Sequence, residues 1–88
     1  MKTLILNKNN LSSVPTQMLV AVISGLEEVY LTETELTTEQ LTGIYRMVAD
    51  RRCSRLRKIN LYGNDHSSVS QDIQDRAGLN ESVYITAL

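Results

Sequence analysis

The sequence contains no tryptophan and no phenylalanine, and tyrosine supplies all four of its aromatic side chains. A hydrophobic core must therefore be built from leucine, isoleucine, valine and methionine. The single cysteine, Cys53, cannot form an internal disulfide bond, which excludes a disulfide-stabilised secreted scaffold. The longest apolar run, residues 18–23, is far shorter than a membrane span, and the first ten residues lack a signal-peptide cleavage site. These absences predict a cytoplasmic protein without a membrane segment.

Neither sign of charge dominates, because 9 basic and 10 acidic residues give a net charge of −1. A chain with this balance has no overall attraction to nucleic acid or to an anionic membrane. Its 88 residues allow one small domain with a thin core.

A nine-residue pattern recurs along the chain: apolar, x, x, apolar, x, apolar, x, x, asparagine. It is clearest at residues 56–64, "LRKINLYGN", and it begins again at residues 1, 26 and, in degenerate form, 80. Its fourth position holds Leu4, Val29, Ile59 and Val83, at spacings of 25, 30 and 24 residues. Periods of 20–50 residues indicate a solenoid. We expect one domain, residues 1–88, divided into units 1–25, 26–55, 56–79 and a partial unit 80–88.

Each unit combines a short strand with a helix. Apolar residues alternate with polar ones inside the nine-residue pattern, as in a half-buried strand. Helical spacing of apolar residues follows in each of the first three units. These stripes are Met18, Leu19, Val22 and Ile23, then Leu41, Ile44, Tyr45 and Val48, then Val69, Ile73 and Ala77. The pairs Thr37–Gln40 and Ser68–Gln71 have the spacing of capping boxes, which predicts where the second and third helices begin.

The pattern resembles that of leucine-rich repeats, in particular the ribonuclease-inhibitor-like subclass found in intracellular innate-immune receptors. The resemblance implies an α/β fold, a right-handed βα superhelix with a parallel four-stranded sheet and about three helices. In that subclass asparagine alternates with a cysteine or small polar residue at the ninth position. Asn9, Thr34 and Asn64 fit this alternation, whereas Leu88 departs from it. The turn asparagines Asn9 and Asn64 are expected to bond backbone groups that the turn leaves unpaired.

The same resemblance implies a binding surface on the concave face of the sheet. Outward positions would be the third, fifth and seventh of each unit. They hold Thr3, Ile5 and Asn7; Glu28, Tyr30 and Thr32; Lys58, Asn60 and Tyr62; and Ser82, Tyr84 and Thr86. Three of the four tyrosines fall in this set, and tyrosine is favoured at interfaces, although it is also a good strand residue. The expected function is a non-catalytic protein–protein interaction module, part of or related to a larger recognition or adaptor protein.

Charge alternates between the units, so that Glu28 and Lys58 are expected to be cross-strand neighbours. The only basic cluster lies at residues 46–58 and contains five arginines and Lys58. These cations straddle a predicted helix end, where they complement the helix dipole, and no aromatic side chain is interleaved to stack bases. Nucleic-acid binding is therefore not expected.

Groups able to do chemistry are few. Cys53 and His66 occupy a helix end and a turn after a strand, with no motif that pairs them. His66 takes the place of Leu11 and Leu36 in the repeat, which predicts a partly buried structural histidine. Glycine-rich phosphate loops and metal-ligand spacings are missing. We expect no catalytic residue, no metal, no cofactor and no enzyme activity.

The ends of the chain suggest an alternative function. Neither end carries a recognisable cap, so the chain is either a fragment of a longer repeat array or a unit whose edges self-associate. In the second case Val83, Tyr84 and Ile85 would form an open edge strand that pairs with another copy in a symmetric homodimer.

Overall fold

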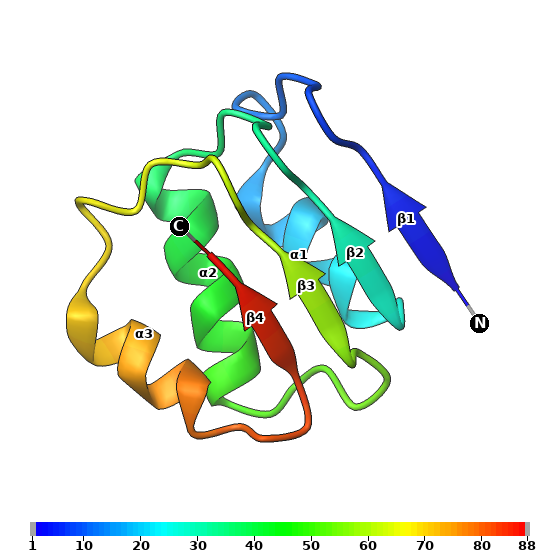
Figure 1. The fold of residues 1–88 in the computed structure, drawn as a ribbon, viewed down its shortest axis with the longest axis vertical. Coiled ribbons are helices and arrows are strands. Elements are labelled where there is room, and N and C mark those ends of the chain that lie inside the picture. The colour runs from blue at the N-terminus through cyan, green and yellow to red at the C-terminus, as the bar shows by residue number, and fades with distance from the viewer. Residues whose placement is uncertain (1, 88) are drawn as a thin grey trace.

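The computed structural model describes residues 2–87, in which three helices and four strands alternate along the chain (Figure 1). In order they are β1 (Thr3–Ile5), α1 (Thr16–Ser24), β2 (Glu28–Tyr30), α2 (Thr38–Ala49), β3 (Lys58–Asn60), α3 (Gln71–Gly78) and β4 (Tyr84–Thr86). The strands form one parallel sheet, and their order across it is their order along the chain. The predicted α/β class and the parallel four-stranded sheet are confirmed.

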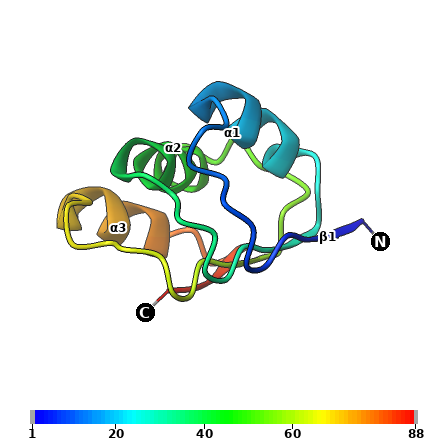
Figure 2. The same cartoon turned by 90° about the horizontal axis from the view of Figure 1, so that it is seen from above.

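All three helices lie on one face of the sheet and leave its other face uncovered within residues 2–87 (Figure 2). The helices form a row in which α2 contacts both α1 and α3. Across the sheet, the central side chains of the strands are in register as Leu4, Val29, Ile59 and Ile85. Val29 and Ile59, on the inner strands, are fully buried, whereas Leu4 and Ile85 on the outer strands are only partly buried. The core therefore centres on the second and third strands.

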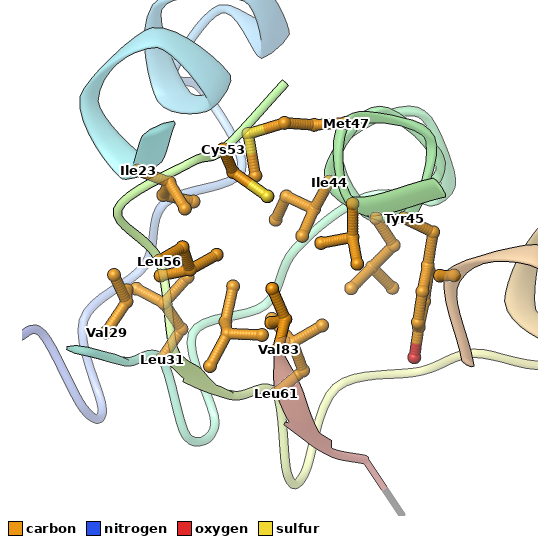
Figure 3. Packing of buried hydrophobic residues seen from close by; sticks show 14 of the residues in the cluster. Ile23, Val29, Leu31, Ile44, Tyr45, Met47, Cys53, Leu56, Leu61 and Val83 are labelled. Atoms are coloured by element: carbon orange, nitrogen blue, oxygen red, sulfur yellow. The ribbon is translucent and has the colours of Figure 1, made fainter. Parts of the chain in front are cut away.

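Aliphatic side chains fill the space between sheet and helices, joined by Tyr45, Met47 and Cys53 (Figure 3). The predicted stripe of the second helix is confirmed, since all four of its members are buried. The side chains with no exposed surface are Ile23, Val29, Leu31, Leu41, Ile44, Met47, Val48, Ala77, Ile59, Leu61 and Thr34. Most of them belong to the second unit or face it.

Helix α2 begins at the predicted capping box. The Thr37 hydroxyl accepts the Gln40 N–H at 3.1 Å, and Gln40 Oε1 accepts the Thr37 N–H at 2.8 Å. The other end of the Gln40 amide donates to the carbonyls of Leu11 and Val14, both at 2.7 Å. Gln40 is only 2% exposed. One side chain thus starts α2 and also holds the loop that precedes α1.

The second predicted capping box is wrong. Ser70, not Ser68, is the N-cap of α3, and it makes no side-chain capping bond. The chain before it is shaped by Asp65, whose carboxylate accepts the Ser67 N–H at 2.9 Å and the Ser67 hydroxyl at 2.6 Å. The Val69 N–H then bonds the His66 carbonyl. This extra turn moves the helix start two residues past the predicted position.

The predicted stripe of the first helix is only half buried. Leu19 and Ile23 lie in the core, but Met18 and Val22 are 59% and 49% exposed. Met18 and Val22 both line an apolar cavity at the β1 end of the molecule, where α1 is the last helix of the row (Figure 2).

The last strand is displaced from its predicted register. Ile85, not Val83, pairs with Ile59, so the third spacing is 26 residues rather than 24. Val83 precedes β4, is only 7% exposed, and donates its N–H to the carbonyl three residues earlier, as Leu26 and Leu56 do. Val83 therefore occupies the first position of the repeat, and the fourth unit is one residue shorter between that position and the strand.

A tight turn of one type follows each of the first three strands. Its third residue has a positive φ in every case: 63° at Lys8, 55° at Glu33 and 80° at Gly63. Turns that need this conformation favour glycine, because a Cβ atom strains it. Only the third turn has glycine there, and a Cβ at Gly63 would lie 2.7 Å from Glu33 Cγ and 3.3 Å from Glu33 N.

We predict opposite outcomes for substitutions at two equivalent turn positions. Gly63→Ala should lower the free energy of unfolding by about 1–3 kcal/mol, because it adds strain at positive φ and crowds Glu33. Lys8→Gly should change it by no more than about 0.5 kcal/mol, because relief of strain offsets the added entropy of the unfolded chain. Urea unfolding followed by circular dichroism measures both values. Equal losses for the two variants would contradict this account of the turns.

Candidate protein-interaction surface

The uncovered face of the sheet displays two rows of side chains. One row runs Thr3, Glu28, Lys58, Tyr84, and the other runs Ile5, Tyr30, Asn60, Thr86. Successive side chains of a strand point to opposite faces, and the residue between each pair faces the helices. These eight residues, the outer sheet face, therefore point away from the core.

Three residues at the centre of the outer sheet face form a connected group. The Tyr30 hydroxyl donates to Glu28 Oε1 at 2.8 Å, within the same strand. Lys58 Nζ lies 5.4 Å from the centroid of the Tyr30 ring, within the range of a cation–π interaction. Glu28 and Lys58 are paired across β2 and β3, as the sequence predicted. All three side chains are partly buried, so the tyrosine ring, the carboxylate and the ammonium group are held in a defined arrangement on this face.

Polar side chains continue the outer sheet face just beyond the strands. Asn7 Oδ1 accepts the Thr32 N–H at 2.8 Å, and Asn60 Oδ1 accepts the Thr32 hydroxyl at 3.3 Å and the Tyr62 N–H at 2.9 Å. Within residues 2–87 the Nδ2 groups of Asn7 and Asn60 have no protein acceptor. They are therefore free to donate to a partner.

The large exposed side chains of the predicted binding set lie on β4, on β1 and in the turn after β3, where Ile5 of β1 is 63% exposed. Tyr84 is 67% exposed and Tyr62 is 48% exposed. Register places Tyr84 beside Lys58, where the sequence had predicted Ser82. Ser82 instead lies in the turn before β4 and donates its N–H to Asn80 Oδ1 at 3.1 Å. Ser82 thus supports the turn and is not part of the outer sheet face.

The predicted open edge strand also differs from expectation, because several of its backbone groups are already bonded to β3. The Tyr84 N–H donates to the Arg57 carbonyl at 2.8 Å, so this donor is already used inside the sheet. The Thr86 carbonyl likewise accepts the Leu61 N–H at 2.7 Å. Because alternate residues of a parallel strand bond the same neighbour, within β4 only Ile85 directs its backbone groups away from β3.

The two turn asparagines have the predicted role but different surroundings. Asn64 Nδ2 donates to the carbonyls of Leu31 and Leu61 at 2.9 and 3.1 Å, and Asn64 Oδ1 accepts the Leu36 N–H at 3.0 Å. Asn64 is 6% exposed. Asn9 is exposed and donates to the Leu6 carbonyl at 3.0 Å and the Asn7 carbonyl at 3.3 Å.

Sequence reasoning missed a third structural asparagine, Asn80. It is 5% exposed, and its Nδ2 donates to the Val48 carbonyl at the end of α2, at 2.9 Å. Its Oδ1 accepts from Arg51 Nη1 at 3.4 Å as well as from the Ser82 N–H. Asn80 lies three residues before Val83. The equivalent position of the preceding unit holds Cys53, so no residue type repeated between the units to indicate a structural role for Asn80.

The arginines of residues 46–58 divide between separate cavities, with Arg46 and Arg52 lining one and Arg55 and Arg57 another. Arg52 lies 3.7 Å from Asp50, and Arg51 contacts Asn80. Arg55 and Arg57 line a cavity of about 410 Å³ that they share with the Glu27 carboxylate. The Lys2 N–H donates to that carboxylate at 2.9 Å and lowers its pKa, with a smaller effect from Arg57. This mixture of signs does not make a continuous phosphate-binding surface.

The groups able to do chemistry lie in structural settings. His66 Nδ1 is 2.7 Å from the Asn64 carbonyl, and its ring packs edge-on against Tyr45 with centroids 5.8 Å apart. Cys53 is 4% exposed, and burial raises the pKa of its thiol. In the part of the chain that the structure describes, histidine, cysteine and acidic side chains form no group of three able to hold a metal ion. No helix there has the length and apolar character needed to cross a membrane.

We predict that Cys53 reacts slowly with thiol reagents in the folded protein. The thiolate is the reactive form, and a raised pKa leaves less thiolate at neutral pH, while burial blocks access. Labelling by Ellman's reagent at pH 7 should be at least about tenfold slower than for glutathione and should become complete in urea. The labelling rate should rise at higher pH than it does for glutathione. Equal rates for Cys53 and glutathione would contradict the buried position of this side chain.

Comparisons with known proteins do not identify a relative. A scan against protein-family models found no matching family, and searches of curated proteins and of solved structures found no match.

Proposed function

We propose that this chain is a non-catalytic protein–protein interaction module of the leucine-rich-repeat type. One geometric repeat supports this assignment beyond the sequence pattern. The side chain at the ninth position donates to the carbonyl three residues earlier in each of three turns: Asn9 to Leu6, Thr34 to Leu31 and Asn64 to Leu61, at 3.0, 2.8 and 3.1 Å. Three stretches that share the nine-residue pattern, with asparagine or threonine at its ninth position, thus use the same side-chain support for the turn. In this proposal the described strands are successive turns of a solenoid.

The observation that carries the binding role is the outer sheet face. It combines an ordered aromatic and charged centre, Tyr30 with Glu28 and Lys58, with an exposed apolar border at Ile5 and Tyr84. Tyrosine and an apolar patch framed by polar groups are typical of protein-binding surfaces. A matching polypeptide would offer acceptors to Asn60 and apolar side chains to Ile5 and Tyr84.

The size of this surface sets the expected affinity. Four three-residue strands about 4.8 Å apart, each about 10 Å long, span a face of roughly 190 Å². A standard interface buries about 800 Å² on each partner. Binding to the outer sheet face alone should therefore be weak. This supports a role inside a larger recognition or adaptor protein, in which further repeats or several copies add contact area.

Self-association through β4 remains the alternative. Tyr84, on β4, one of the two edge strands of the sheet within residues 2–87, favours it by being largely exposed. A strong contact at this edge is disfavoured, because Tyr84 and Thr86 already direct their backbone groups to β3.

A peptide library displayed on phage, selected against the wild-type chain, tests the proposed binding face. We expect selected peptides to lose binding to the double variant Tyr30→Ala and Tyr84→Ala, because both rings on the outer sheet face are removed. They should still bind the double variant Gln17→Ala and Glu39→Ala, whose exposed positions lie on the helices. Circular dichroism checks that each variant is folded.

Two results would contradict the proposal. Selected peptides that bind the tyrosine variant as tightly as the wild type would place recognition elsewhere. Selected peptides that lose binding only to the helix variant would move it to the opposite side of the molecule.

A further inference from the structure

The end of the molecule at β1 and α1 exposes apolar side chains that form a continuous flank. A cavity of about 140 Å³ opens there, and its lining is apolar. We define the β1–α1 flank by the residues of β1, α1 and the loop between them that line this cavity and are not buried in the core, which leaves out Leu19 and Ile23. They are Leu4, Leu6, Leu11, Val14, Met18 and Val22.

In the third unit, the positions that correspond to the exposed residues of α1 are covered by a neighbouring helix. Residues 64–70 repeat the pattern of residues 9–15 at an offset of 55, so Met18 corresponds to Ile73 and Val22 to Ala77. Ile73 and Ala77 are 9% and 0% exposed, and α3 packs against α2. Met18 and Val22 are 59% and 49% exposed, and α1 stands at the end of the helix row (Figure 2). The β1–α1 flank thus has the chemistry of a helix-packing surface.

The flank carries no charge that would oppose contact with another apolar surface. Helix α1, with sequence TQMLVAVIS, contains no charged residue. Lys2 and Lys8 border β1 at its two ends rather than on the flank itself.

Within residues 2–87, the outer side of α3 at the opposite end of the molecule does not offer a matching surface. In α1, the residues that approach the next helix are Thr16 and Val20, which lie closest to Gly43 of α2. The same offset of 55 places Gln71 and Asp75 at these positions in α3. Both are exposed and are hydrogen-bonded to each other at 2.9 Å. Head-to-tail packing would therefore set an apolar flank against a carboxylate, whereas a second β1–α1 flank matches in character.

We propose that two copies of this chain associate through their β1–α1 flanks about a two-fold axis. The edge of β1 can take part, because the Lys2 carbonyl and the Leu6 N–H bond β2. Backbone groups of the alternate residues, Thr3 and Ile5, then point to the open side and can pair antiparallel with the same residues of the second copy. This contact lies away from the centre of the outer sheet face, so both can be used at once.

The size of the flank makes the contact weak. The molecule measures 30 × 27 × 22 Å, so an end face is on the order of 600 Å², below the about 800 Å² per partner of a standard interface. Association in the micromolar range follows, with a monomer at low concentration.

Sedimentation velocity of the full chain, from low micromolar to several hundred micromolar, tests the proposal. The wild type should shift from monomer to dimer across this range. Met18→Glu and Val22→Glu should each raise the dissociation constant at least about tenfold, because two like charges meet at a symmetric apolar contact. Both positions are half exposed in the monomer, so circular dichroism should be unchanged.

Two control variants test whether the effect is specific to the β1–α1 flank. Gln17→Glu adds the same charge to an exposed position of α1 that lines a cavity with Gly43 and Arg46 of α2, and Leu79→Glu adds it at the opposite end, where Leu79 is 73% exposed. Both should dimerise like the wild type. The proposal is overturned by a wild type that stays monomeric throughout, or by flank variants that dimerise as tightly as the wild type. Loss of the dimer in Leu79→Glu would equally overturn it and would favour contact through the β4 end.

Discussion

The side-chain amide of Asn64 is the interaction on which the central layers depend. It bonds the carbonyls at the ends of the second and third strands and the N–H of Leu36, one residue before the N-cap of α2. One buried group thereby sets the spacing between two strand ends and the direction in which the chain leaves for the helix. The Leu36 N–H would otherwise be buried without a partner, at a cost of about 1–3 kcal/mol. The Leu31 and Leu61 carbonyls each accept one further bond, from the Thr34 hydroxyl and the Asn64 N–H.

Features that depend on near neighbours were predictable from the sequence. The Thr37–Gln40 box and the role of Asn64 in its own turn involve residues three apart, and the stripe of the second helix follows from spacing alone. The contacts of Gln40 with Leu11 and of Asn80 with Val48 join residues 29 and 32 positions apart, and no local pattern reports them. The last strand was misplaced because Val83 and Ile85 are both aliphatic, and the deletion of one residue changes which of them enters the sheet.

The outer sheet face and the β1–α1 flank result from the same arrangement of layers. With all three helices on one side of the sheet, the opposite side is uncovered within residues 2–87 and its residues point away from the core. The helix row also has two ends, and α1 forms one of them. The spacing of apolar residues identifies the apolar side of α1 but does not show what covers it. Burial is deepest around α2, which has a neighbouring helix on each side. Substitutions on the outer sheet face or on the β1–α1 flank should therefore leave the fold largely intact.

The central role of Asn64 is tested most directly by comparing Asn64→Leu with Asn9→Leu in urea unfolding. The two asparagines occupy equivalent turns, but Asn64 is buried between layers, whereas Asn9 is exposed and bonds only its own turn. We expect Asn64→Leu to lower the free energy of unfolding by about 1–3 kcal/mol or more, and Asn9→Leu to lower it by less than about half as much, because water replaces its bonds. Equal losses, or an unchanged urea midpoint for Asn64→Leu, would contradict this account.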